Sequence, residues 1–221
     1  MRYIYMKLKI AIPNSLDDIT LSQYKRFIKI QDQTQNARLL NAKMIEIFCS
    51  TKLEEVMRLK LSDTEEIVGI LGSMFEQKPD LVRKFNINNT DFGFHPQLDD
   101  LSLGEYIDLD TYIGDWDNME RAMNVLYRPI TASLKEQYSI VDYKTELNPA
   151  ILHMPMSAVL SSIFFLWNLG LDLSKVMTNS LEDNQTEILT EYLTSQGSGV
   201  GINQFMVSLK EILQDLKVSL N

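Results

Sequence analysis

The chain has 221 residues, of which 45% are hydrophobic and 23% are charged, enough for one sizeable core or for two small lobes that share one. The formal net charge is −9 and the isoelectric point is about 4.8. Nucleic-acid-binding proteins usually carry a basic field, so this balance argues against a nucleic-acid partner. The single cysteine, Cys49, cannot form an internal disulfide, and a reducing, cytoplasmic setting is expected.

The N-terminal segment predicts a short strand and then a helix. Polar and apolar residues alternate over Lys7–Ile12, which is the period of a strand, and Pro13 would end it. Thr20 stands before an apolar stripe of helical spacing. The sequence therefore predicts a helix from Leu21 to about Asp32.

The next segment predicts three helical elements in quick succession. Asn36–Ser50 carries apolar residues on one broad face, and a shorter element continues from Leu53 to Leu61. Asp63 to Glu66 then has the pattern of a capping box, in which the Glu66 side chain would reach back to the backbone of Asp63. Apolar residues at helical spacing follow as far as Phe75.

Over Lys84–Pro96 the hydrophobic pattern changes from helical spacing to alternation, because aromatic and aliphatic residues now alternate with polar ones. Asn88 and Asn89 stand at the centre of this stretch, and asparagine tolerates the left-handed turn of a tight hairpin. The stretch predicts a β-hairpin. Whether the Lys7–Ile12 strand joins it as a third strand is left open.

Two short helices with an acidic turn between them are predicted next. Ser102–Glu105 forms a second capping-box pattern that opens a helix through Tyr112, and Asp115 caps the following helix. We expect Pro129 to end that helix, because the residue before a proline is pushed out of the helical region. Thr131–Tyr143 is mixed and predicts no clear element.

Leu147–Leu171 contains no Asp, Glu, Lys or Arg over 25 residues, which is long enough to span a bilayer. Pro149, Pro155 and several polar residues interrupt the run, however. A buried central helix over about Met156–Asn179 is therefore the preferred interpretation, and a membrane helix is the alternative.

The C-terminal part predicts a helix over Leu181–Ser195, a glycine-rich hinge over Gln196–Gly201, and an amphipathic helix from Ile202 to Asn221. An amphipathic helix after a hinge can dock on its own domain, which we expect, or in the groove of a partner. The candidate partner-binding residues on its apolar face are Phe205, Met206, Leu209 and Leu213.

The acidic residues between Asp99 and Asp117 do not form a calcium loop. Counted from Asp108, the fifth position is Tyr112 and the sixth is Ile113, where an acid or amide and then a glycine are needed. The chain has two histidines, and neither has a cysteine or carboxylate at ligand spacing. The sequence predicts no catalytic residue, cofactor or metal, and Arg128 is expected to pair with one of these acids.

Four short stretches stand out in the sequence. They are Ile12-Pro13 followed by Asp18-Ile19-Thr20-Leu21 and Tyr24; Leu103-Gly104-Glu105-Tyr106-Ile107-Asp108-Leu109; Ala122-Met123 with Leu126-Tyr127-Arg128-Pro129-Ile130; and Met154-Pro155-Met156 before Phe164-Phe165. The last three resemble small proteins encoded among the tail and virion genes of tailed bacteriophages. The first is similar to the start of phage tail assembly chaperones.

The resemblance implies a non-enzymatic assembly protein, either a tail assembly chaperone or a structural component of the virion neck, ring, adaptor or baseplate. A chaperone would hold a tail or tape-measure client through an apolar groove or through the C-terminal helix. The implied partners are phage tail or neck proteins and copies of the chain itself, without nucleic acid or membrane. The implied location is the host cytoplasm, or the virion for a structural component. The 11 methionines suit varied apolar partners.

The expected fold is mainly α, a compact multi-helix domain with a small β-hairpin or a three-stranded antiparallel element. We expect one domain over residues 1–221. A division into two helical lobes, 1–96 and 97–195, with the helix 202–221 after the hinge, is left open.

Overall fold

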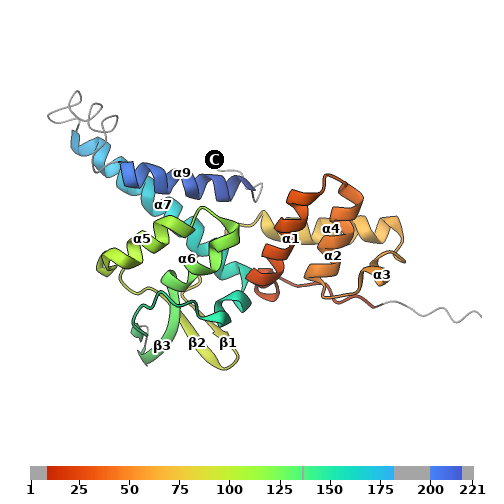
Figure 1. Cartoon of the computed structure of the whole chain (residues 1–221), viewed down its shortest axis with the longest axis horizontal. Helices are drawn as coiled ribbons and strands as arrows, with labels where there is room; N and C mark the ends of the chain where they lie inside the picture. The colour runs from red at the N-terminus through yellow and green to blue at the C-terminus, as the bar shows by residue number, and fades with distance from the viewer. Residues whose placement is uncertain (1–8, 136, 182–199, 216–221) are drawn as a thin grey trace, which may run out of the picture.

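The structure is a computed structural model that describes residues 9–135, 137–181 and 200–215 (Figure 1). The helices are η1 (Leu16–Asp18), α1 (Leu21–Gln33), α2 (Ala37–Phe48), α3 (Leu53–Val56), α4 (Leu61–Phe75), η2 (Leu98–Asp100), α5 (Leu103–Tyr112), η3 (Trp116–Asn118), α6 (Met119–Leu126), η4 (Pro149–His153), α7 (Met156–Leu181) and α9 (Val200–Asp215). The strands are β1 (Lys84–Ile87), β2 (Thr90–Phe94), β3 (Tyr127–Leu134) and β4 (Gln137–Ile140).

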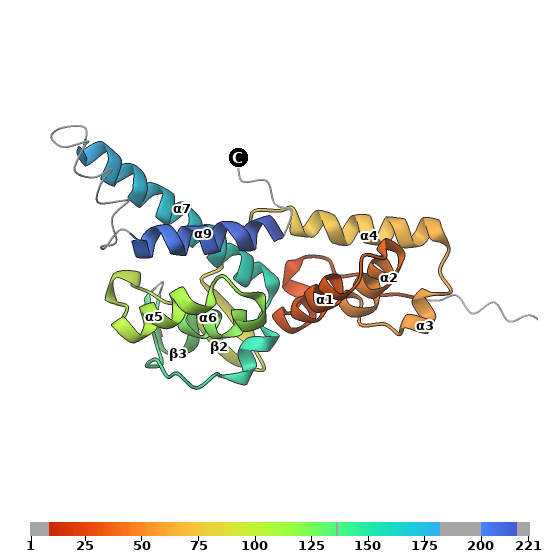
Figure 2. The same cartoon turned by 45° about the horizontal axis from the view of Figure 1, so that its top comes forward.

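Helices α1 to α4 form one side of the molecule, and the strands with α5 and α6 form the other (Figure 2). The start predicted for α1 is confirmed: Thr20 caps it, and the reciprocal hydrogen bonds with Gln23 complete a capping box. Helices α1, α2 and α4 pack through aromatic rings. Phe48 contacts Phe27 with ring centroids 5.3 Å apart and Phe75 with centroids 5.5 Å apart.

Two predictions for this half are wrong. Helix α4 begins at Leu61 after the N-cap Lys60, which forms no side-chain cap, so Asp63 does not open a capping box. Asp63 lies inside the first turn instead, where the helix dipole favours a carboxylate. Residues 9–12 of the predicted Lys7–Ile12 strand form no strand, and residues 7 and 8 lie outside the described ranges.

The hairpin prediction is confirmed, but the expected fold class is not. Asn88 and Asn89 have φ of 49° and 64°, as a type I′ turn between β1 and β2 requires. The sheet is antiparallel with four strands in the order β1-β2-β3-β4. The mainly α fold with a hairpin or a three-stranded element is therefore wrong, and the fold mixes helices with a four-stranded sheet. The partner of the hairpin is β3, not the N-terminal segment.

Pro129 is the reason that the sequence analysis did not predict strand β3. Helix α6 ends at Leu126, and Tyr127 already begins β3, so Pro129 lies inside a strand rather than at a helix end. Pro129 stands opposite Phe92 in the register, and its carbonyl accepts a hydrogen bond of 2.9 Å from the Val141 amide. The steric effect that pushes the preceding residue out of the helical region leads here directly into extended backbone.

The central helix prediction is confirmed by α7, which begins at Met156 as expected. Within the described ranges, no helix combines the length and the apolar character that crossing a membrane requires. Helix α9 lies along α7 in both views (Figures 1 and 2). Leu181 is the last residue of α7, and the rest of the predicted helix Leu181–Ser195 and most of the glycine-rich hinge lie outside the described residues. Helix α9 takes up the last two residues of that hinge.

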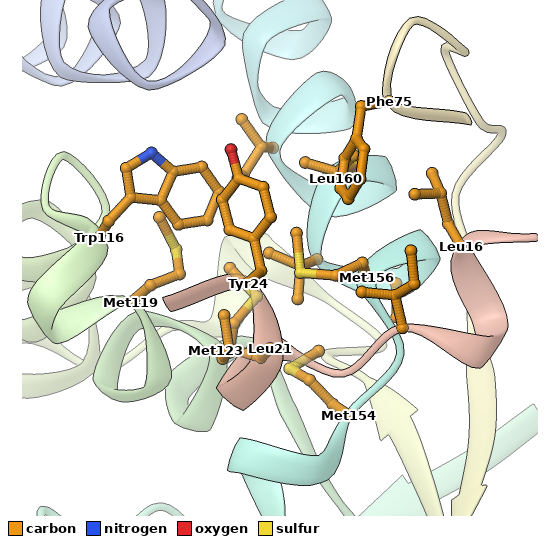
Figure 3. Packing of buried hydrophobic residues seen from close by; sticks show 14 of the residues in the cluster. Leu16, Leu21, Tyr24, Phe75, Trp116, Met119, Met123, Met154, Met156 and Leu160 are labelled. Atoms are coloured by element: carbon orange, nitrogen blue, oxygen red, sulfur yellow. The ribbon is translucent and has the colours of Figure 1, made fainter. Parts of the chain in front are cut away.

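One hydrophobic cluster connects the two sides of the molecule. Figure 3 shows its centre, where Met119, Met123, Met154 and Met156 are packed between α1, α6 and α7, each with no exposed surface. Most of the described methionines thus fill the core, where an unbranched thioether fits irregular gaps. Met57 is the clear exception and is 70% exposed.

Candidate functional site

Helix α9 docks on its own chain, as the sequence analysis expected. Leu209 and Leu213 have no exposed surface, and Ile212 is 1% exposed. Two glycines leave room for the helix: a Cβ on Gly170 would lie 2.0 Å from the sulfur of Met206, and a Cβ on Gly114 would lie 2.7 Å from the Cβ of Ser208. The docking surface is therefore shaped for close approach of α9.

The four predicted partner-binding residues are not presented together to solvent. Leu209 and Leu213 are buried, Phe205 and Met206 are half-buried against the core, and the neighbouring Val207 is 47% exposed. A partner could reach the buried pair only if α9 left α7. Another surface with an apolar lining lies beside the end of α9.

This surface is a groove between α1, α2 and α4 that reaches the last described residue of α9, Asp215. We call it the α9 groove; its volume is about 350 Å³. Its apolar lining is Tyr24, Phe27, Leu40, Met44, Phe48 and Phe75. Most of these rings also contact one another, so the walls are preformed by the packing of three helices.

An acidic cavity of about 450 Å³ adjoins the α9 groove, and Gln31 and Asp215 line both. It lies between the end of α1, the segment that contains η3, and the end of α9. Its charged lining is Lys25, Asp32, Asp115, Asp117 and Asp215. Carboxylates therefore outnumber cations on this wall.

Some of these charges are already neutralised. The Lys25 ammonium contacts the Glu120 carboxylate and donates a hydrogen bond of 2.8 Å to the Asp117 carbonyl, and Lys29 lies 3.2 Å from the Asp117 carboxylate. Asp115 accepts hydrogen bonds from the Asp117 amide and from Asn118. Each of these groups has a structural partner.

Asp32 and Asp215 differ from these acids, because neither forms an ion pair within the part of the chain that the structure describes. Burial, followed by repulsion from Asp32 and Glu211, raises the pKa of Asp215. The end of α9 thus brings like charges together without a cation among the described residues to offset them.

Trp116 and Tyr24 form the wall where the two cavities meet. Their ring centroids are 4.6 Å apart, and Trp116 lines the acidic cavity while Tyr24 lines the α9 groove. Figure 3 shows the indole nitrogen and the tyrosine hydroxyl on the side facing away from Met123 and Leu21. Trp116 is 6% exposed, and its Nε1 donor has no hydrogen-bond partner among the described residues.

The expected pairing of Arg128 with the acidic cluster is confirmed. Arg128 Nη2 lies 2.7 Å from Glu105 Oε1, and both side chains are 8% exposed. Glu105 also accepts hydrogen bonds from the Ser102 amide at 2.8 Å and from its hydroxyl at 2.7 Å, so the capping box and the ion pair share one carboxylate. The pair joins the first turn of α5 to β3, and its role is structural.

His95 completes this polar cluster without forming a catalytic arrangement. Its Nε2 lies 3.9 Å from Glu105 Oε1, beyond hydrogen-bond distance, and its Nδ1 accepts from the Gln97 amide at 3.4 Å. Burial, and then the charge of Arg128, lowers the pKa of His95. Burial opposes ionisation of Glu105, but the Ser102 hydrogen bonds and the charges of Arg128 and His95 outweigh it and lower its pKa.

The remaining reactive groups lie apart from one another. Burial raises the pKa of the Cys49 thiol, which disfavours the nucleophilic thiolate. Tyr143 donates a hydrogen bond to Asp108, and burial, followed by this bond, raises the pKa of its hydroxyl. Within the described ranges, no three His, Cys, Asp or Glu side chains are placed to hold a metal ion.

The sequence analysis missed Asp32, Trp116 and Asp215. One signal was available for Asp32: it lies in the last turn of α1, where the helix dipole disfavours a negative charge and no basic residue compensates. The convergence of Asp32 with Asp215 joins residues far apart in the chain, and no local pattern encodes it.

Comparisons of the chain with protein-family models, with curated proteins and with solved structures found no match. The geometry of the two cavities is therefore the basis for a functional proposal. An apolar groove with aromatic walls beside unpaired carboxylates is suited to binding another chain.

Proposed function

We propose that the protein is a non-enzymatic assembly factor of a tailed bacteriophage, most specifically a tail assembly chaperone that holds a tail or tape-measure client. The resemblance of Leu103–Leu109 and of the N-terminal run to such proteins motivates the assignment. The α9 groove supplies the binding surface that this role requires. The net charge of −9 keeps an unassembled chaperone apart from its copies.

The observation that carries the proposal is the apolar lining of the α9 groove, where the half-buried Leu40 and Met44 lie beside largely buried rings. Its volume of about 350 Å³ matches the size of a few apolar side chains. Phe48 and Phe75 are held by neighbouring rings, while Leu40 and Met44 are half-buried and accessible. Rigid aromatic walls with an adaptable methionine at the rim are typical of surfaces that accept helical segments of a partner.

Capture of tail proteins from cells that express the phage tail genes tests the proposal. The full chain should retain a tail component, and Met44→Glu should reduce the retained amount about tenfold because it places a charge in the apolar groove. Leu134→Glu is the matched control, since Leu134 is 75% exposed at the end of β3 and lines neither the α9 groove nor the acidic cavity. Equal capture by both variants would remove the groove from the proposal.

A structural role in the virion is the second candidate, and one observation favours it. The outward face of α5 exposes Leu103 at 75%, Tyr106 at 42% and Ile107 at 51%, which is a continuous apolar stripe of helical spacing. Such a stripe suits contact between copies in a ring. Mass spectrometry of purified particles separates the two roles, because a chaperone is absent from particles and a ring protein is present in multiple copies.

A further inference from the structure

We infer that the α9 groove and the acidic cavity together bind an amphipathic partner segment with one apolar face and with lysine or arginine at one end. The inference rests on the proposed function and names the chemistry of the client that the groove would hold. Two observations carry it: the continuity of the two cavities and the unpaired carboxylates.

The two cavities form one elongated depression. Gln31 and Asp215 line both, and the Tyr24–Trp116 ring pair stands between them. One half is lined by Phe27, Phe48 and Phe75, and the other half by acids. A segment that fills both halves must therefore bring apolar side chains to one end and cations to the other.

The acids of the acidic half indicate that the partner's charge is positive. Lys25 is occupied by Glu120, so it does not neutralise Asp32 or Asp215. Burial, followed by repulsion from Asp32 and Glu211, raises the pKa of Asp215, and a lysine or arginine from a partner would offset that repulsion. A second copy of this acidic chain is a poorer fit, because it carries a net charge of −9.

Titration of the full chain with designed peptides tests the inference. The chain has two tryptophans, and the Trp167→Phe background leaves Trp116 as the fluorescence reporter. The probe is a tryptophan-free peptide of about 14 residues, about four helical turns, with leucines on one face and arginines in the turn at one end. The same peptide with glutamates in place of arginines, and a peptide with the arginines but no apolar face, are the comparison probes.

We expect the first peptide to change the Trp116 fluorescence with saturation and to bind about tenfold more tightly than either comparison peptide. In the same background, Asp32→Asn with Asp215→Asn should weaken its binding about tenfold. Asp80→Asn with Asp99→Asn removes the same charge from exposed acids outside both cavities, and it should leave binding unchanged.

Four outcomes overturn the inference. These are no saturable binding, equal binding of the glutamate peptide, equal loss in the two asparagine pairs, and binding that occurs only after deletion of residues 216–221. The last result would make the chain's own C-terminal segment the occupant. Client capture that persists in the Asp32→Asn, Asp215→Asn chain would leave the proposed function standing and remove only this inference.

Discussion

Two groups of charged side chains differ in whether their charges are paired. Between α5 and β3, Glu105 and Arg128 are both 8% exposed and face each other at 2.7 Å. At the end of α9, Asp32 and Asp215 lie near each other without a cation among the described residues. The first group is closed and neutralised, and the second is open and like-charged.

The contrast indicates what each group is for. A buried pair with matched hydrogen bonds fixes how two elements fit together, whether or not it adds net stability. Unpaired charges beside an apolar groove reduce stability in the free protein and are relieved by a partner. Loss of a charge should therefore harm folding at the first site and harm binding at the second.

The largest expected effect is at Glu105. Glu105→Gln keeps the shape of the side chain but leaves Arg128 buried without its counter-charge, so the free energy of unfolding should fall by about 3–5 kcal/mol. Urea denaturation followed by circular dichroism measures the change. Asp99→Asn, an exposed acid of the same cluster, is the control and should stay within about 0.5 kcal/mol of the parent chain. A small effect of Glu105→Gln would mean that the pair does not join α5 to β3.

A smaller loss of stability is expected from substitution of Gly93, which lies in β2 opposite Arg128 of the Glu105–Arg128 pair. A Cβ there would lie 2.4 Å from the ring of Tyr138, whose hydroxyl donates to the Phe94 carbonyl at 2.6 Å and is therefore held in place. Gly93→Ala should lower the free energy of unfolding by about 1–3 kcal/mol.

Gly69→Ala is the matched control for this glycine. A Cβ at Gly69 meets nothing within 4 Å, and the residue lies within α4. This substitution should raise the free energy of unfolding by up to about 1 kcal/mol, because alanine favours the helix. Destabilisation of similar size in both variants would contradict the close packing of Tyr138 on β2.

The next effect in size is the pH dependence of stability, which should reflect the lowered pKa values of His95 and Glu105 beside Arg128. The pKa of His95 is lowered in the folded chain, so protonation is less favourable there than in the unfolded chain, and stability falls as the pH drops through the ordinary value of about 6.5. The pKa of Glu105 is also lowered, so its contribution is lost only in stronger acid, below about pH 4.3.

Melting temperatures of the parent chain and of His95→Gln between about pH 7.5 and about pH 5.5 check this prediction. The parent chain should lose more of its melting temperature over this interval than the variant does, because the variant has no imidazole to protonate. Parallel curves would show that His95 titrates in the same way in the folded and unfolded chains.

The smallest expected change in stability is at Asp32 and Asp215, where loss of a charge should stabilise the chain. Asp215→Asn removes repulsion from Asp32 and Glu211, so the melting temperature at neutral pH should rise slightly. The rise should shrink as the pH falls and the parent carboxyl itself becomes neutral. A clear fall in melting temperature would mean that Asp215 has a stabilising partner and that the two charge groups are alike.

Local features that depend on a few neighbouring residues were predictable from the sequence. The Thr20 and Ser102 helix starts, the Asn88-Asn89 turn, and the start of α7 at Met156 all follow from capping, turn chemistry or apolar length. The pairing of Arg128 with the acidic cluster was predictable as a class of contact, because a buried arginine needs a carboxylate.

Only the tertiary structure decided what depends on partners distant in the chain. Pro129 was read as the end of a helix, and the pairing of β3 with β2 made it part of a strand. The meeting of Asp32, Trp116 and Asp215 required α9 to dock on α7 with its end against α1. Composition and periodicity fix which face of an element is apolar, whereas the packing of whole elements decides which charges are left facing each other.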